Sequence, residues 1–267
     1  MRRWFVRSVL ALAGGTALVA GIGWLLLDAD LRRLALNLPT NANVLFWPQA
    51  TRDAAFRAMD RLPFLAKARE IARGPTVQPL PEGRPLPLPV DVVGYMAAQR
   101  TAGLVILHEG RIRLERYGLD FGPGGRWTSF SVAKSLTSTL VGAAIRDGRI
   151  RRLDDKVSDY IAGLKGSAYD DVSIEQLLTM TSGVRWNEDY SDRESDVARF
   201  NRHKAEPGVD TTVSYMRRLP REFPPGSRWV YKTGETNLIG VLVSSATGRP
   251  LADYLSEKVW SPFGMEQ

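Results

Sequence analysis

The sequence predicts an α+β protein: an antiparallel sheet flanked by helices, a helical subdomain, and an N-terminal membrane helix. Three observations lead to this class. Within residues 103–117 an apolar run and a run of alternating polarity flank a Glu-Gly turn, residues 131–258 are patterned mostly as helices, and residues 8–27 carry no charge. A strand pair followed by a series of helices is typical of α+β architecture, in which the helices cover an antiparallel sheet.

The first thirty residues have the pattern of a membrane anchor. Three arginines lie within residues 1–7, and the twenty residues Ser8 to Leu27 are uncharged. At about 1.5 Å of rise per residue, twenty residues span the roughly 30 Å hydrocarbon core of a bilayer. Arginines before the span favour a cytoplasmic N-terminus. We therefore predict a single-pass protein of the inner membrane whose remainder faces the periplasm or the outside. Cleavage as a signal peptide, with a secreted product, is the alternative.

The rest of the chain divides into a linker and a globular domain. We assign residues 1–30 to the anchor, residues 31–89 to a helical and proline-rich linker, and residues 90–267 to the domain. Six prolines between residues 75 and 89 favour an extended, semi-rigid segment. Within the domain the pattern predicts a β-hairpin at 103–117 and helices at 91–100, 131–147, 173–180, 211–218, 235–246 and 250–258.

Composition excludes several kinds of site. The chain of 267 residues has a net charge of +7, but its arginines are scattered and no nucleic-acid motif is present, so we expect no nucleic-acid partner. Cysteine is absent, which excludes disulfides, thiolate nucleophiles and Cys-ligated zinc. His108 and His203 are the only histidines, too few for a His-rich metal site. We predict no metal and no cofactor; oligomeric state has no signal in the sequence.

The segment Ser131-Val-Ala-Lys134 is the candidate catalytic motif. Side chains three residues apart lie on the same face of a helix, so the lysine amine can approach the serine hydroxyl. A serine hydroxyl is a weak nucleophile that needs a neighbouring base, and a neutral lysine can serve as one. Ser131 also opens an apolar helix, whose free N–H groups favour a developing oxyanion. The alternative is a helix serine beside a solvated lysine.

Three ordered blocks then identify a family resemblance. The block from Ser131 to Gly142 resembles the first conserved block of β-lactamase-related serine hydrolases, and the block from Ile174 to Gly183 resembles the second. Pro225-Gly226 with Tyr231-Lys-Thr233 resembles the third, where class C β-lactamases and carboxylesterases have Tyr-x-Asn. Together with Arg185 to Tyr190, the pattern is most similar to 6-aminohexanoate-dimer hydrolases.

This resemblance implies a β-lactamase/transpeptidase-like fold and a serine hydrolase that forms an acyl-enzyme. Ser131 would be the nucleophile, and Lys134 and Tyr231 would share proton transfer. Thr233 and Tyr190 would contact the substrate, a small amide or ester. Two alternatives stay open at this point: a non-catalytic envelope protein with the same fold, and a DD-peptidase-type penicillin-binding protein.

Two features depart from the family pattern. The triplet Lys232-Thr233-Gly234 spells the family's Lys-Thr-Gly motif, but it adjoins Tyr231 and leads into a helical pattern, so we interpret the match as coincidence. Family members also continue beyond the position of Gln267 with further strands and a second oxyanion donor. We therefore expect the domain to lack the C-terminal strands of its sheet, which puts the activity of the chain as written in question.

Overall fold

The computed structural model describes residues 15, 18, 21–37, 43–62 and 69–266. The chain forms two compact units. Unit 1 comprises residues 1–68 and 80–128, and unit 2 comprises residues 69–79 and 129–267. The predicted linker is thus shared between the units, since residues 69–79 belong to one and residues 80–89 to the other.

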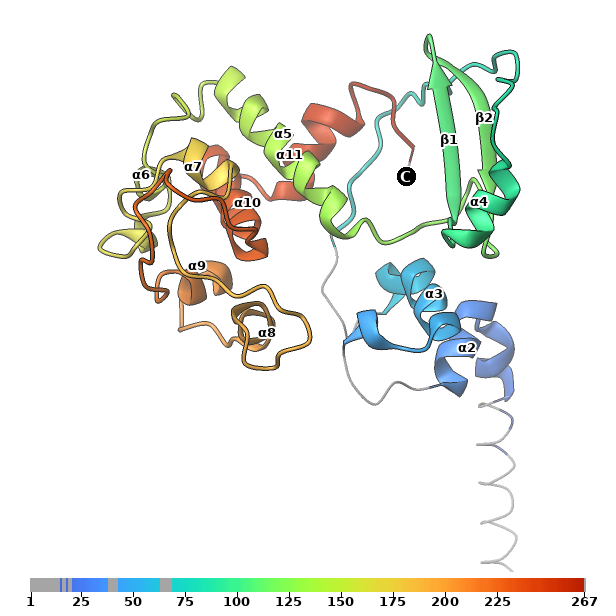
Figure 1. Ribbon diagram of the computed structural model, residues 1–267, viewed down its shortest axis with the longest axis horizontal. Coiled ribbons are helices and arrows are strands. Elements are labelled where there is room, and N and C mark those ends of the chain that lie inside the picture. The colour runs from blue at the N-terminus through green and yellow to red at the C-terminus, as the bar shows by residue number, and fades with distance from the viewer. Residues whose placement is uncertain (1–14, 16–17, 19–20, 38–42, 63–68, 267) are drawn as a thin grey trace, which may run out of the picture. The chain divides into compact units, whose positions relative to one another are not determined.

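Unit 1 combines helices with a hairpin (Figure 1). An apolar cluster of Leu34, Trp47, Ala54, Ala55, Ala58 and Leu62 joins its first two helices. Asp28 caps the first of them by accepting the N–H groups of Asp30 and Leu31. The helices are α2 (Ala29–Leu36), α3 (Gln49–Ala58) and α4 (Val92–Ala98), with 3₁₀ turns at Val44–Phe46 and Met59–Arg61.

The predicted hairpin is present. Strands β1 (Gly103–His108) and β2 (Arg111–Tyr117) pair antiparallel, with His108 opposite Arg111. The turn residues Glu109 and Gly110 both have positive φ, 54° and 68°. This is the backbone of a type I′ turn, whose twist matches that of the strands. Part of the proline-rich segment lies beside β2, where the Gly83 N–H donates to the Ile112 carbonyl at 2.8 Å.

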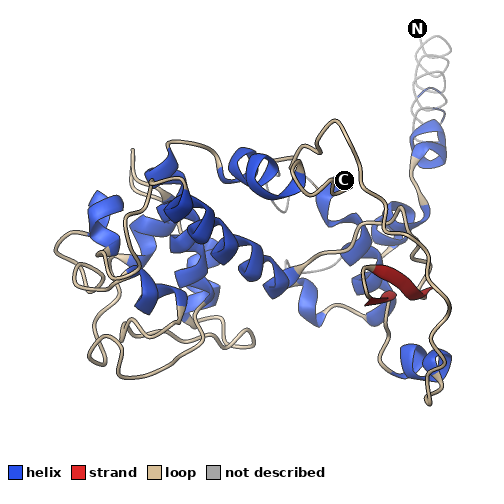
Figure 2. Ribbon diagram, turned by 90° about the horizontal axis from the view of Figure 1, so that it is seen from above, coloured by secondary structure: helices blue, strands red, loops and turns tan. Residues whose placement is uncertain are grey.

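Helices and long loops make up the described part of unit 2, as Figure 2 shows. Most predicted helices are present with shifted ends, whereas two short helices within residues 157–202 were not predicted. The helices are α5 (Ala133–Arg146), α6 (Val157–Tyr160), α7 (Ile174–Leu178), α8 (Asp196–Arg202), α9 (Thr211–Met216), α10 (Thr233–Thr247) and α11 (Leu251–Leu255), with 3₁₀ turns at Phe130–Val132 and Ala162–Leu164 and a π turn at Ser256–Trp260.

The core of unit 2 lies where α5 packs against α10. Leu140, Val141 and Ala144 of α5 are buried in one apolar cluster with residues of α10, namely Leu238, Ile239, Leu242 and Val243. Each fully buried leucine contributes about 1.5–3 kcal/mol relative to an exposed one. Gly248, with a φ of 70°, ends α10 in the left-handed conformation that glycine adopts most easily. The two longest helices of unit 2 are therefore held together by apolar contacts.

The predicted membrane anchor, residues 8–27, lies largely outside the described residues. Among the residues that are described, no helix has the length and apolar character needed to cross a membrane.

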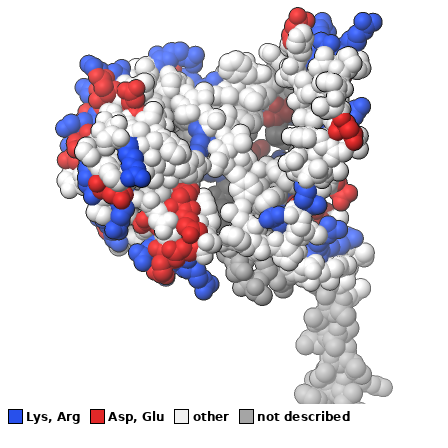
Figure 3. Space-filling model, viewed as in Figure 1, with Lys and Arg blue, Asp and Glu red and all other residues white. Residues whose placement is uncertain are grey.

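Charged side chains of both signs are interspersed on the face of unit 2 drawn in Figure 3. Ion pairs are found within unit 2: Arg151 contacts Asp155 at 3.1 Å, and Arg217 and Arg218 both contact Glu206. Several arginines of unit 2 are thus paired locally with carboxylates.

Asp147 connects the end of α5 to the region of α11. Its carboxylate accepts from Lys258 Nζ at 2.6 Å and from the Tyr254 hydroxyl at 2.9 Å. These two hydrogen bonds, that of Lys258 first, lower the pKa of Asp147 below its ordinary value of 3.8. A carboxylate at a helix C-terminus is otherwise disfavoured by the helix dipole, so the lysine offsets a local cost.

We predict that Asp147→Asn lowers the unfolding temperature, and that the loss depends on pH. Because the folded pKa is depressed, the charged carboxylate stabilises the fold above pH 3.8, and this contribution is lost as the pH falls through the lower folded value. Thermal unfolding followed by circular dichroism should show a gap between parent and variant near neutral pH that closes in acid. A gap of constant size would contradict the assignment.

Candidate active site

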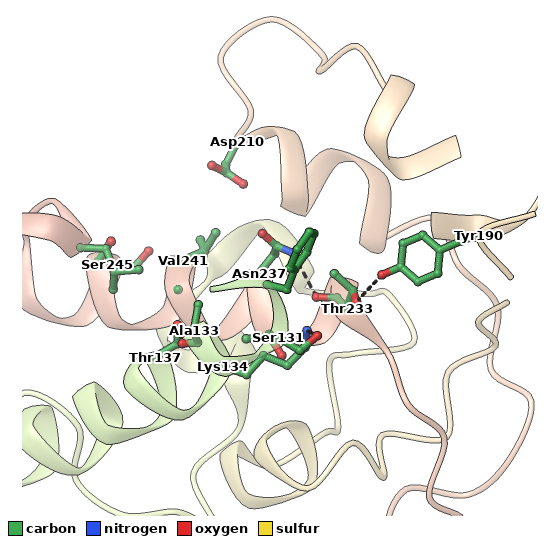
Figure 4. Close-up of a pocket in the computed structure, with 15 residues that line it drawn as sticks. Ser131, Ala133, Lys134, Thr137, Tyr190, Asp210, Thr233, Asn237, Val241 and Ser245 are labelled. Carbon is green, nitrogen blue, oxygen red and sulfur yellow. Dashed lines mark hydrogen bonds between the residues drawn. The ribbon is translucent and has the colours of Figure 1, made fainter. Parts of the chain in front are cut away.

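Four of the five predicted site residues line one cavity of unit 2, and the fifth lies beside it. The cavity has a volume of about 780 Å³. Ser131 comes from the 3₁₀ turn before α5, Lys134 and Thr233 from the starts of α5 and α10, and Tyr190 from the loop before α8 (Figure 4). Other lining residues are Phe130, Ala133, Thr137, Asp210, Thr236, Asn237, Gly240, Val241, Ser244, Ser245 and Leu251.

Ser131, Lys134 and Tyr231 meet in direct hydrogen-bond contact. Ser131 Oγ lies 2.8 Å from the Tyr231 hydroxyl, and Lys134 Nζ donates to Ser131 Oγ at 3.2 Å. Lys134 Nζ also lies 5.0 Å from the centre of the Tyr231 ring, within the range of a cation–π contact. The fold thus brings the hydroxyls of Ser131 and Tyr231, 100 positions apart in sequence, into hydrogen-bond contact. The structure brings the predicted nucleophile, Ser131, together with Lys134 and Tyr231, the two residues predicted to share proton transfer.

The turn that carries Ser131 differs from the prediction. Ser131 was expected on the α-helix itself, but it lies in the 3₁₀ turn Phe130–Val132, and α5 begins at Ala133. Phe130 has a φ of 43°, a left-handed conformation that is rare for a bulky residue and costs about 1–3 kcal/mol. In a 3₁₀ turn, side chains three residues apart are eclipsed. Lys134 is therefore still aligned with Ser131, although the helix starts later than predicted.

Tyr231 and Thr233 reach the site because the backbone between them is extended. Lys232 has φ −140° and ψ 103°, so successive side chains point to opposite sides. Tyr231 contacts Ser131, and Thr233 lines the cavity. Lys232 points the other way and is fully buried, with 0% exposure. The triplet from Lys232 to Gly234 leads into a helix, α10, rather than lying on a strand.

Glu188 connects the two predicted substrate-binding residues, and sequence reasoning did not single it out. Its Oε1 accepts the Tyr190 hydroxyl at 2.8 Å and also the Thr233 hydroxyl. Its Oε2 accepts the Thr233 N–H at 2.9 Å and the Trp186 indole N–H. Burial raises the pKa of Tyr190 above its ordinary value of 10. The sequence indicated Glu188 only indirectly, as one residue of the Trp-Asn-Glu-Asp-Tyr segment that contributes to the family resemblance.

A second polar cluster lies beneath Tyr231. Lys232 Nζ lies 3.2 Å from Glu235 Oε1 and donates to Ser182 Oγ at 3.1 Å, with both members of the ion pair at 0% exposure. Ser182 and Tyr169 donate to the same Glu235 oxygen. Burial raises the pKa of the Glu235 carboxyl, while the charge of Lys232 opposes that rise. The other oxygen, Glu235 Oε2, has no hydrogen-bond partner among the described residues.

Neither histidine takes part in the cavity. His203 Nε2 lies 2.8 Å from Ser214 Oγ, and His108 Nδ1 lies 3.1 Å from the guanidinium of Arg113 on the hairpin. Within the described ranges, no group of His, Asp and Glu side chains is arranged to hold a metal ion.

Comparison with known proteins identifies the family. The family model described as Beta-lactamase matches residues 91–267. The chain belongs to the Beta-lactamase family. This confirms the resemblance found in the three sequence blocks, and with it the β-lactamase/transpeptidase-like fold.

Individual members of the Beta-lactamase family show the same relationship. The chain is 30% identical over 166 residues to the 6-aminohexanoate-dimer hydrolase of Paenarthrobacter ureafaciens, covering 60% of this chain and 42% of that protein. It is 27% identical over 183 residues to a Beta-lactamase of Pseudomonas fluorescens, covering 64% of this chain and 46% of the relative. The chain therefore spans less than half the length of these curated relatives.

A solved structure supports the fold. A Bacillus anthracis protein, provisionally named a 6-aminohexanoate-dimer hydrolase, superposes with a TM-score of 0.71 over 82% of this chain and 61% of the other, at 19% identity. At that identity the likeness concerns the fold alone. Hydrolases of the Beta-lactamase family are thus the relatives of this chain, by sequence and by architecture.

We predict that Glu188→Ala destabilises unit 2 by about 1–3 kcal/mol, because donors from Trp186, Tyr190 and Thr233 lose a charged acceptor. Glu188→Gln should cost less, since an amide oxygen still accepts and the hydroxyls can reorient. The measurement is urea unfolding of each variant. Glu194→Ala is the matched control, because this exposed carboxylate forms a surface ion pair with Arg199, whose loss should cost less than about 1 kcal/mol. Equal losses for Glu188 and Glu194 would contradict the role assigned to Glu188.

Proposed function

We propose that this chain is a serine hydrolase that cleaves an amide or ester bond through an acyl-enzyme. The observation that carries the proposal is the position of Ser131 Oγ, which contacts both the Tyr231 hydroxyl at 2.8 Å and Lys134 Nζ at 3.2 Å. The cavity of about 780 Å³ beside it offers room for a small substrate. A nucleophile with two candidate proton acceptors at a cavity is the arrangement that covalent catalysis requires.

In the acylation step, Ser131 Oγ attacks the carbonyl carbon of the substrate. Its proton passes to Tyr231 in its phenolate form or to Lys134 in its neutral amine form. The carbonyl oxygen, which becomes negatively charged, accepts a hydrogen bond from the Ser131 N–H. The tetrahedral intermediate then collapses. The bond to the leaving amine or alcohol breaks as that group takes the proton back, and an ester of Ser131 remains.

Deacylation repeats these steps with water. The same pair removes a proton from the attacking water and returns it to Ser131 Oγ as the ester bond breaks. When it is Tyr231 that takes the proton, protonated Lys134, which contacts Ser131 Oγ and lies over the Tyr231 ring, stabilises negative charge on either oxygen. The products are a carboxylic acid and the amine or alcohol released earlier.

For the substrate class, the cavity favours a short amide with polar groups. Besides Ser131, the wall of the cavity carries hydroxyls and a side-chain amide, supplied by Thr137, Thr236, Ser244 and Asn237. Asp210 adds one carboxylate on the opposite side, visible in Figure 4. A 6-aminohexanoate-dimer hydrolase is among the relatives of this chain. We propose an amide of that general kind rather than a bulky bicyclic one.

The test is labelling of the full chain by a fluorophosphonate probe. Ser131→Ala should abolish labelling, and Lys134→Ala and Tyr231→Phe should each slow it by about 10²–10⁴-fold, the usual contribution of a proton-transfer group. Ser135→Ala is the control, because this exposed serine lies on the same helix outside the cavity. Labelling that survives Ser131→Ala would refute the proposal.

A DD-peptidase-type activity is the second candidate, because one relative in Escherichia coli K12, 29% identical over 118 residues, is provisionally named a D-alanyl-D-alanine carboxypeptidase. A fluorescent penicillin distinguishes the two. Stable, Ser131-dependent acylation by penicillin would favour the peptidase, whereas fluorophosphonate labelling without penicillin acylation favours the amide hydrolase.

We also propose that residues 8–27 anchor the chain in the inner membrane, with the hydrolase domain outside the cytoplasm. The support is the uncharged stretch after an arginine-rich start. The full chain should sediment with membranes after a high-salt wash, and a variant that lacks residues 8–27 should not. Recovery of a shortened, freely soluble chain from the parent would instead support a cleaved signal peptide.

A further inference from the structure

The buried ion pair of Lys232 and Glu235 lies immediately behind the residue that contacts the nucleophile. Both side chains have 0% exposure, and Lys232 is the direct neighbour of Tyr231. Removing two charges from water is costly, and well-packed apolar residues of similar size often stabilise a fold as well or better. Core packing alone therefore gives no reason for charges at this position.

We propose that Lys232 is a positioning residue that holds Tyr231 against Ser131, with Glu235 and Ser182 as its anchor. This inference rests on the proposed function, since it concerns the reactivity of Ser131. The backbone at Lys232 is extended, so turning its side chain into the core necessarily turns the side chains of Tyr231 and Thr233 to the opposite side.

The anchor determines how deep Lys232 reaches. Its Nζ contacts Glu235 Oε1 at 3.2 Å and Ser182 Oγ at 3.1 Å, so the end of the long side chain has defined partners. An apolar side chain would fill the same space without a directional contact at its tip. Glu235 lies in the first turn of α10, three residues after Lys232, which connects the anchor rigidly to the helix that packs on α5.

Ser182 connects the same anchor to a second segment. Its hydroxyl accepts from Lys232 and from the Val184 N–H at 3.1 Å, and it donates to Glu235. The segment next to it also holds the backbone before Tyr231, because the Val230 N–H donates to the Met180 carbonyl at 3.1 Å. The Met-Thr-Ser-Gly block therefore supports Tyr231 from behind, although none of its residues lines the cavity.

This role is distinguishable from a general contribution to stability. A positioning residue acts through Tyr231, so its removal should matter only while Tyr231 has a hydroxyl to place. Removal of a residue that merely stabilises the core should slow the reaction of Ser131 by the same factor whether position 231 is Tyr or Phe. A double-mutant cycle measures that difference directly, since residues in contact show an interaction energy that distant ones lack.

The experiment measures the fluorophosphonate labelling rate of the full chain, per folded molecule, for Lys232→Met, Tyr231→Phe and the double variant. We expect Lys232→Met to slow labelling by about tenfold or more in the parent and by less than about twofold when Tyr231→Phe is present. Leu164→Ala, another fully buried position of unit 2, is the control and should not slow labelling of the folded fraction. Equal slowing in both backgrounds, or none in the parent, would overturn the proposal.

Hydrogen exchange gives a second readout that does not depend on activity. In Lys232→Met the amides of residues 229–236 should exchange faster than in Leu164→Ala when urea sets both variants to equal global stability. Equal exchange there would overturn the positioning role even if the parent chain is not labelled at all. An unlabelled parent with fast exchange in Lys232→Met would refute the proposed hydrolase while retaining the structural inference.

Discussion

The packing of α5 against α10 is the constraint on which the candidate site depends. Ser131 lies in the 3₁₀ turn before α5 and Lys134 in the first turn of that helix, while Tyr231 precedes α10 and Thr233 begins it. The contact between the Ser131 and Tyr231 hydroxyls therefore joins the segments that lead into the two helices. Apolar side chains in the middle of both helices pack in one cluster and keep these two segments close to each other. The closely packed interior of unit 2 thus helps to set the distance between the two hydroxyls.

Polar groups behind the cavity fix the positions of the site residues more closely than the apolar core alone does. Glu188 holds Thr233 and Tyr190 from one side, and the cluster of Lys232, Glu235 and Ser182 holds the Tyr231 segment from the other. Hydrogen bonds have directions that apolar contacts lack, and buried polar groups are costly unless they are satisfied. Such clusters restrict the backbone to one conformation. Apolar packing of equal strength restricts it less, because its contacts have no preferred direction.

Local patterns predicted the elements well, whereas contacts between distant segments escaped prediction. The hairpin, α5 and α10 follow from periodicity, and the approach of Lys134 to Ser131 follows from a spacing of three residues. Tyr231 was identified only through family resemblance, because it lies 100 positions from Ser131. Glu188 was overlooked because its role depends on Thr233, 45 positions away, and the 3₁₀ turn at Ser131 depends on a local strain at Phe130 that no periodicity reveals.

All five predicted site residues belong to unit 2, and the hydrogen bonds that place them are made within it. Within the described residues, the hairpin and the helices of unit 1 supply none of these hydrogen bonds. Evolutionary substitutions in the two units therefore reach the candidate site differently. A substitution in unit 2 can change a hydrogen bond that places one of the five side chains, whereas a substitution in unit 1 has no such bond to change.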